Sequence, residues 1–181
     1  MAVIGYIKKN WKIILLCMAF GVLGILFALA NAEAYHATAD AEFCVKCHAM
    51  EPLVASYKED IHGGKNEHGV RAGCCDCHLP HDSATRYVIA KNVTSLKDIW
   101  GNFVIGPENI DWEEKRNHRE RFTYDSGCMG CHHELEEASM GNKQAFLPHR
   151  DYFRGSTNET CVSCHPNVGH KDLGLHLKKE E

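Results

Sequence analysis

The most extended hydrophobic stretch of the sequence lies near its N-terminus. Residues 13–30 form 18 consecutive positions without a charged or amide side chain. As an α-helix this stretch would be about 27 Å long, close to the ~30 Å hydrocarbon core of a bilayer. Lysines precede it and acidic residues follow it, which by the positive-inside rule places the N-terminus in the cytoplasm. We therefore predict a cytoplasmic segment at 1–12 and a single-pass anchor in the lipid bilayer of a bacterial inner membrane at 13–32. A periplasmic domain over 33–175 and a tail at 176–181 follow.

A cleaved signal peptide is the alternative reading of this stretch. The sequence Ala-Asn-Ala at 30–32 resembles a cleavage site, but the apolar run is longer than the usual signal-peptide core. We favour the retained anchor. A mature protein beginning at Glu33 would instead indicate cleavage.

Beyond the anchor, the apolar positions predict helices and no convincing strand. The segment 83–103 has large apolar residues at roughly helical spacing, and 112–122 forms a second candidate helix. Gly106 and Pro107 separate the two segments. We expect a mainly α fold with much irregular structure.

A five-residue pattern, Cys-x-x-Cys-His, occurs four times and uses eight of the 10 cysteines. Two thiols add to the two vinyl groups of a porphyrin, and the next histidine can bind its iron, so this pattern is typical of covalent c-type haem. Zinc knuckles are the alternative, but they do not require a histidine in every copy. The sequence therefore predicts four c-type haems, attached at Cys44 and Cys47, Cys74 and Cys77, Cys128 and Cys131, and Cys161 and Cys164.

The spacing of the four motifs predicts two dihaem halves. The segment between Cys74 and Cys128 is much longer than the segment between Cys44 and Cys74 or that between Cys128 and Cys161, and the last two are nearly equal. The halves fall at about 40–100 and 120–172. Hydrophobic residues make up only 44% of the chain, the anchor included, so the porphyrins would supply much of the core of a compact tetrahaem domain.

Iron ligands are expected among the 13 histidines. Low-spin haem needs two axial ligands, so histidines outside the motifs are required. His62 precedes Cys74 by the same number of positions as His149 precedes Cys161, and His170 follows the last motif. His81 is a weaker candidate because it stands close to His78. The predicted axial ligands are His48, His62, His78, His132, His149, His165 and His170.

These features resemble the NapC/NirT/NrfH family of membrane-anchored tetrahaem quinol dehydrogenases. The resemblance covers nearly the whole chain and includes the anchor, the paired motifs, and the segments CHAMEP, GVRAGCCDCHLPH and CVSCHPNVGH. It implies a protein that oxidises menaquinol or ubiquinol from the membrane pool at the outer face of the cytoplasmic membrane. It also implies electron transfer through four haems to a periplasmic reductase in anaerobic respiration, with nitrate, nitrite or another compound as the final acceptor.

The resemblance also implies two details of the site. Met50 corresponds to a methionine that binds the first haem iron in some relatives, and we prefer it to His48 because a thioether raises the haem potential. Lys91 and Asp98 correspond to a quinol site, with Lys97 as an alternative to Lys91. A carboxylate can accept a quinol proton and an ammonium can stabilise the quinol oxygen. An ordinary solvated helix face is the other interpretation of Lys91 and Asp98.

Other functions are compatible with the same residues. One is a periplasmic electron shuttle, and another is a membrane tether for a multihaem nitrite-reductase-type complex without its own quinol site. A terminal reductase is not expected, because enough histidines are present to fill most iron positions. A homo-oligomer or a complex with a multihaem enzyme is compatible with the sequence. The net charge of −4 argues against nucleic-acid binding.

Overall fold

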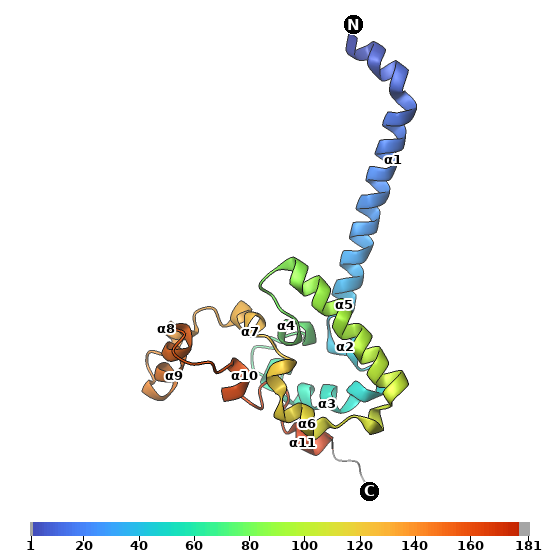
Figure 1. The fold of residues 1–181 in the computed structure, drawn as a ribbon. Coiled ribbons are helices and arrows are strands. Elements are labelled where there is room, and N and C mark those ends of the chain that lie inside the picture. The colour runs from blue at the N-terminus through green and yellow to red at the C-terminus, as the bar shows by residue number, and fades with distance from the viewer. Residues whose placement is uncertain (1, 178–181) are drawn as a thin grey trace. The chain divides into compact units, whose positions relative to one another are not determined.

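The structure, a computed structural model, describes residues 2–177, and within that range all regular secondary structure is helical, with no strand (Figure 1). This agrees with the fold class predicted from the sequence. The chain divides into two compact units, with the division between Ala39 and Asp40. Residues 178–181 of the predicted tail lie outside the described residues.

The first unit consists of one helix, α1 (Ala2–Ala37). Its segment Lys8–Ala37 has a mean hydropathy of 2.8 over 30 residues and is long and apolar enough to cross a membrane. Large apolar side chains such as Leu16, Phe20 and Phe27 are exposed along it. The helix contains the predicted anchor at 13–32 and extends beyond it at both ends.

The second unit is built of short helices joined by irregular segments. Its α-helices are α2 (Ala41–Cys44), α3 (Glu51–Glu59), α4 (Cys74–His78), α5 (Ala84–Trp100), α6 (Trp112–Asn117), α7 (Asp125–Cys131), α8 (Leu135–Ser139), α9 (Lys143–Phe153), α10 (Cys161–Cys164) and α11 (Leu173–His176). The 3₁₀-helices are η1 (His48–Met50), η2 (Ile61–Gly63), η4 (Pro107–Asn109) and η5 (Arg119–Arg121), and η3 (Gly101–Ile105) is a π-helix.

The predicted helix at 83–103 is present as α5 and η3. Ser83 caps its start by accepting a hydrogen bond from the Arg86 backbone N–H. Gly106 ends the π-helix with a φ of 86°, a left-handed conformation that glycine adopts without strain, and Pro107 begins the next short helix.

The predicted helix at 112–122 is shorter than expected. Asp111 caps α6 by accepting from the Glu114 backbone N–H. The α-helix ends at Asn117, because His118 has φ −122° and ψ 41° and a separate 3₁₀ turn follows. The sequence pattern of this charged segment did not predict that the α-helix ends at Asn117.

The second unit has very little apolar core of its own. In the described part of it few apolar residues are buried, and Tyr57 is the largest of them: Ala41, Ala49, Val54, Tyr57, Leu79 and Val162. The largest fully buried side chain is Ser56, whose hydroxyl donates to the Lys171 carbonyl at 2.9 Å. A domain of this size ordinarily buries far more apolar surface, so the protein atoms alone do not account for its core.

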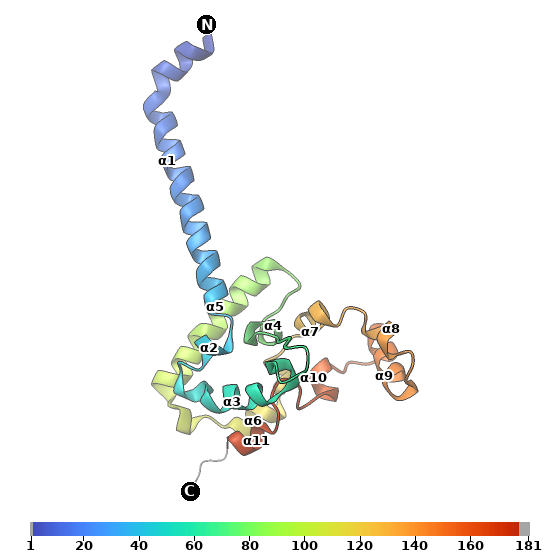
Figure 2. The same cartoon turned by 180° about the vertical axis from the view of Figure 1, so that it is seen from behind.

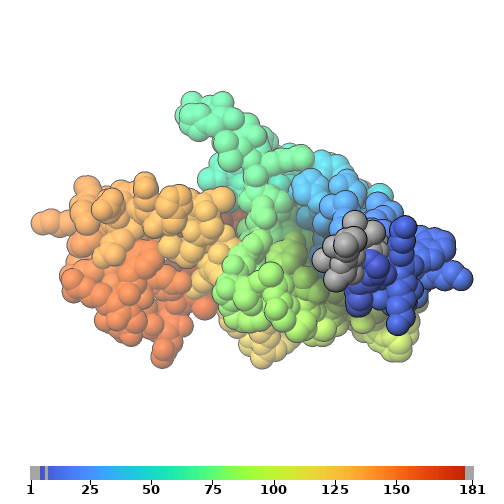
Figure 3. All heavy atoms as spheres, turned by 90° about the horizontal axis from the view of Figure 1, so that it is seen from above, coloured from blue at the N-terminus to red at the C-terminus, as the bar shows by residue number. Residues whose placement is uncertain are grey.

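Within the second unit, helices distant in sequence lie side by side. α11 contacts α3, and α4 contacts α7, as can be followed from behind in Figure 2. The consecutive helices α8 and α9 also contact each other. In the space-filling view, α8 and α9 (orange) gather at one end of this unit, away from α5 (green) (Figure 3). Short helices therefore carry the motifs, and packing between helices brings the motifs together.

Candidate haem-binding and quinol-binding site

The four Cys-x-x-Cys-His motifs are, in chain order, the first (44–48), second (74–78), third (128–132) and fourth (161–165). Each overlaps a short helix, respectively α2, α4, α7 and α10. None of the ten cysteines forms a disulfide. The thiols are therefore all available for other chemistry.

Thiols connect the first motif to the second and the third to the fourth. Cys44 and Cys74 share a hydrogen bond and pack against the same small cluster of buried side chains. Cys128 and Cys161 share a corresponding hydrogen bond, which lowers the pKa of the Cys128 thiol to about 7. The Asp125 carboxylate adds a further tie by accepting from the Cys161 backbone N–H at 3.0 Å.

Backbone packing connects the second motif to the third. The Tyr124 N–H donates to the Cys77 carbonyl at 3.0 Å, and α4 lies against α7. At Gly127 a Cβ atom would overlap the carbonyl oxygen of Asp76, so this approach requires glycine. The four motifs therefore follow one another in space in the same order as in the sequence.

Imidazole rings from distant parts of the chain face one another in three pairs. The ring centres of His62 and His132 are 6.2 Å apart, those of His78 and His170 are 6.1 Å apart, and those of His149 and His165 are 6.1 Å apart. A metal–imidazole bond is about 2.0 Å long and the ring centre lies about 1.1 Å beyond the bonding nitrogen, so two rings on opposite sides of one metal have centres about 6.2 Å apart. The three pairs have the spacing of axial ligands.

Hydrogen bonds to Nδ1 leave the other nitrogen of three of these six rings available. The Nδ1 of His62 lies 3.0 Å from Asp60 Oδ1, that of His78 2.6 Å from the Phe122 carbonyl, and that of His170 3.1 Å from the Leu53 carbonyl. Such contacts fix the tautomer and direct Nε2 toward a metal.

His149 differs from the other ligand candidates because its Nδ1 is buried without a hydrogen-bond partner. A buried polar atom of this kind calls for a partner that the protein atoms do not provide.

Burial keeps two of these rings neutral. Desolvation lowers the pKa of His78, and desolvation together with nearby His78 lowers the pKa of His170 to about 4. Only neutral imidazole binds a metal, so both rings are prepared for ligation. Within residues 2–177 no group of three or more His, Cys, Asp or Glu side chains forms a ligand set for a bare metal ion.

The first motif lies in different surroundings. The His48 side chain is 79% exposed, and its Nδ1 is 3.2 Å from Glu51 Oε2. Within the described residues no second imidazole faces it. Met50 is half-buried at the end of η1. His81, the weaker ligand candidate, follows the second motif. Its Nε2 lies 3.0 Å from the Cys75 carbonyl.

Lys91 and Asp98 lie on α5 close to the first motif. Lys91 is only 7% exposed, whereas Lys97 is exposed. The hydrogen bond with Cys74 is the main cause of the lowered pKa of the Cys44 thiol, and the charges of Asp98 and Lys91 both act on the same sulfur in opposite senses. Asn102, in the following π-helix, accepts from the Ala49 N–H at 3.3 Å and holds this segment against the motif.

The Asp98 carboxyl has a raised pKa. Asp98 is an exposed residue, but the surrounding chain partly desolvates its carboxyl, and this desolvation outweighs the opposing charges of Lys115 and Lys97. A carboxylate with a raised pKa is a better proton acceptor.

The opposite face of α5 is apolar and exposed. Ile89, Val93, Leu96 and Trp100 follow the three- and four-residue spacing of one helix face and are all exposed. Phe103, in η3, is 75% exposed. By the same periodicity Lys91 and Asp98 fall on the other side, so α5 has its charged pair toward the first motif and its apolar face outward.

Comparison with known proteins agrees with this architecture. The profile described as "NapC/NirT cytochrome c family, N-terminal region" matches residues 7–174. The chain belongs to the NapC/NirT cytochrome c family. This is a family of membrane-anchored, haem c-binding electron-transport proteins, as the resemblance drawn from the sequence predicted.

Individual relatives differ in length. The chain is 33% identical over 175 residues to the cytochrome c-type protein TorY of Escherichia coli O157:H7, covering 90% of this chain and 46% of TorY. It is 33% identical over 158 residues to the denitrification system component NirT of Stutzerimonas stutzeri, covering 82% of this chain and 77% of NirT. The chain thus spans about half the length of some curated relatives.

A solved structure shares the fold. One chain in a crystal structure of the cytochrome c nitrite reductase NrfHA complex bound to the HQNO inhibitor aligns with a TM-score of 0.57 and 22% identity. The alignment covers 92% of this chain and 99% of that chain. At that identity the likeness supports the fold alone.

The residues fit c-type haem. The paired rings have the spacing of axial ligands, His149 Nδ1 is a buried orphan, and the second unit lacks an apolar core of its own. Sequence reasoning did not identify Asp60, Asn102 or Gly127 as contributors. Asp60 had one recognisable signal, since an aspartate shortly before His62 is placed to cap a turn.

Proposed function

We propose that this chain is a tetrahaem cytochrome c, anchored in the cytoplasmic membrane with its N-terminus in the cytoplasm. It oxidises menaquinol or ubiquinol at the outer face and passes the electrons through four haems to a periplasmic reductase. The observation that supports this most strongly is the first motif, which lacks a facing imidazole among the described residues and lies beside Lys91 and Asp98.

The proposed haem attachment uses the eight motif cysteines. His78 with His170, His132 with His62, and His165 with His149 are the proposed axial pairs of the second, third and fourth haems. Met50, in preference to the solvent-directed His48, is the proposed ligand at the first. Each haem, when bound, supplies one-electron transfer.

Residues of this chain handle the protons and the position of the quinol. Oxidising a quinol releases two protons along with two electrons, so a base near the first motif is needed. Asp98, with its raised pKa, accepts one of these protons, and the other is released to the water to which this residue is exposed. The buried Lys91 ammonium donates a hydrogen bond to the quinol oxygen and stabilises the negative charge that develops there.

The exposed apolar face of α5 is an argument for a lipid-soluble electron donor. An exposed apolar helix face is typical of segments that lie at a membrane surface, and here it belongs to the same helix as Lys91 and Asp98. A water-soluble shuttle would have no use for either feature. This favours quinol oxidation over the shuttle function.

The proposed partner is a periplasmic reductase that accepts electrons beyond the fourth motif. The structural relative comes from a nitrite reductase complex, which supports a proposal of complex formation with a multihaem enzyme.

The test compares substitutions at the two lysines and at Asp98 in the full, haem-loaded chain in lipid vesicles. Asp98→Asn and Lys91→Gln should reduce the rate of haem reduction by quinol by about 100-fold or more, as expected for loss of a positioned base. Lys97→Gln, which removes an exposed charge from the same helix, should retain the wild-type rate.

Dithionite reduction provides the control for intact cofactors. All variants should carry four haems by the pyridine haemochrome assay and be fully reduced by dithionite. Normal quinol oxidation by Asp98→Asn would contradict the proposed site. An effect of Lys97→Gln without one of Lys91→Gln would transfer the role to Lys97.

A further inference from the structure

We infer that Asp60 is a positioning residue that lowers the midpoint potential of the haem attached at Cys128 and Cys131. The inference rests on the proposed ligation of that haem by His62 and His132. It concerns how one residue of this chain acts on its neighbouring ligand.

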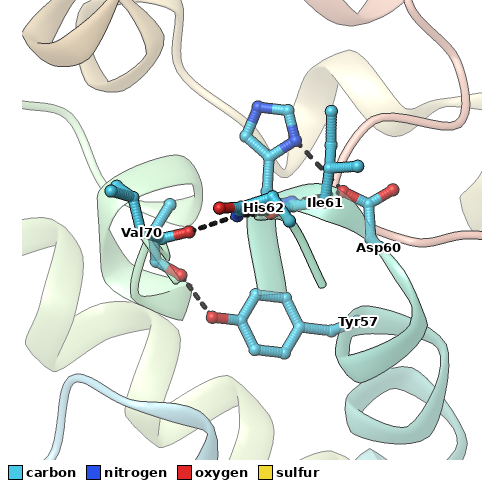
Figure 4. Close-up of polar contacts among 7 residues, drawn as sticks. Tyr57, Asp60, Ile61, His62 and Val70 are labelled. Atoms are coloured by element: carbon cyan, nitrogen blue, oxygen red, sulfur yellow. Dashed lines mark hydrogen bonds and ion pairs between the residues drawn. The ribbon is translucent and has the colours of Figure 1, made fainter. Parts of the chain in front are cut away.

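The Asp60 carboxylate holds His62 through two contacts from a single oxygen. Oδ1 accepts from the His62 backbone N–H at 2.8 Å and lies 3.0 Å from the ring Nδ1. Figure 4 shows the carboxylate pointing at the ring. Asp60 is 8% exposed, so water screens its charge only weakly.

The backbone around His62 is held as well. The His62 carbonyl accepts from the Ala72 N–H at 2.9 Å, and the Tyr57 hydroxyl donates to the Ala72 carbonyl at 2.5 Å. Tyr57 is itself buried. Loss of the Asp60 charge alone would therefore leave the ring in place.

Asp60 distinguishes His62 from the proposed ligands His78, His170 and His149. The rings of His78 and His170 have neutral carbonyl oxygens as Nδ1 partners, and His149 Nδ1 has none. Among these four rings, only that of His62 has a carboxylate as its partner. A hydrogen bond to a charged acceptor is roughly twice as strong as one to a neutral acceptor.

The physical consequence has a definite sign. A carboxylate draws the Nδ1 proton toward itself and makes the ring a stronger electron donor to iron. Its negative charge also favours the more positive ferric state over the ferrous state. Both effects stabilise the oxidised haem, so they lower its midpoint potential.

Asp60→Asn tests the inference, because asparagine has the same shape and retains an oxygen that can cap η2. In an EPR-monitored redox titration of the full, haem-loaded chain, we expect one haem to become easier to reduce. The ratio of reduced to oxidised haem at a fixed potential should rise about tenfold, equivalent to about 59 mV for one electron. A smaller shift of the same sign is expected at the second haem, because the Asp60 charge also reaches His170.

Glu59→Gln is the matched control. It removes the same charge at the adjacent position, but Glu59 is paired with Lys65 and does not contact a ligand. We expect all four potentials to remain unchanged in it. Equal shifts in both variants, or no shift in Asp60→Asn, would overturn the inference.

His62→Ala separates this failure from failure of the proposed ligation. If His62 is a ligand, that variant loses one low-spin haem by magnetic circular dichroism. Loss of a low-spin haem in His62→Ala with unchanged potentials in Asp60→Asn would reject the role of Asp60 alone. An unchanged low-spin count in His62→Ala would reject the ligation and the inference together.

Discussion

The first motif and the three later motifs share a five-residue pattern but have different surroundings. Each later motif histidine faces a second imidazole at 6.1–6.2 Å. His48 of the first motif is directed to solvent and contacts Glu51. The motif predicts where a haem is attached, whereas the surrounding fold determines which side chains face the motif histidine.

This difference suits two separate proposed roles, electron entry at the first motif and electron relay at the other three. Two strong axial ligands leave no position on the iron for other molecules, which suits haems that only relay electrons. The first motif, for which Met50 is the proposed ligand and beside which Lys91 and Asp98 lie, suits the proposed position where electrons arrive. Substitutions at the first motif and at the three later motifs should therefore have effects of different kinds and sizes.

Removing one member of an imidazole pair should change ligation outright, whereas removing His48 should not. His170→Ala leaves His78 without a facing ring, so one low-spin haem should become high-spin. His48→Ala should leave the number of bis-histidine haems unchanged. Magnetic circular dichroism counts these haems directly, and a lost bis-histidine signal in His48→Ala would remove the distinction between the first motif and the others.

A methyl group at the contact between α4 and α7 should destabilise the packing of the second motif against the third. Gly127→Ala would press its Cβ onto the Asp76 carbonyl, and overpacking of this kind typically costs about 1–3 kcal/mol. We expect a lower thermal unfolding midpoint by circular dichroism. Gly130→Ala, in the same helix with nothing within 4 Å of its Cβ, is the control. Equal stability of the two variants would argue against close packing of the second and third motifs.

A smaller effect concerns pH at the first motif. Asp98 accepts a proton only when ionised, so quinol oxidation should fall as the pH drops through its pKa, which burial raises above the ordinary 3.8. The Lys115 charge lowers this pKa. Lys115→Gln should therefore move the acid limb of the rate profile to higher pH, while Lys143→Gln should not. Coincident profiles for Lys115→Gln and wild type would contradict the role given to Asp98.

The sequence predicts local features of this protein well. Haem attachment at the four five-residue patterns stays a prediction, whereas the periodicity of 83–103 specifies α5 because its apolar residues repeat at helical spacing. Gly106 and Pro107 mark its end for stereochemical reasons that act over a short stretch of chain. The lack of a convincing strand signal agrees with the described part of the fold.

Partner choice between distant histidines could not be predicted in the same way. His62 and His149 occupy equal offsets before their motifs, which suggests equal roles. In the structure His149 faces His165 of the same predicted half, whereas His62 faces His132, which falls in the other predicted half. Long-range packing decides this, and a repeat in spacing does not encode it. The contacts of Asp60 and Gly127 depend on the same packing.

The most direct test of the central claim is an EPR-monitored redox titration of the full chain in lipid vesicles, with and without a redox-inert quinol analogue. We predict that the analogue changes the signal and potential of one haem, the one lacking a bis-histidine spectrum, and leaves the three bis-histidine haems unchanged. A response confined to a bis-histidine haem, or no response from any haem, would contradict the assignment of quinol oxidation to the first motif.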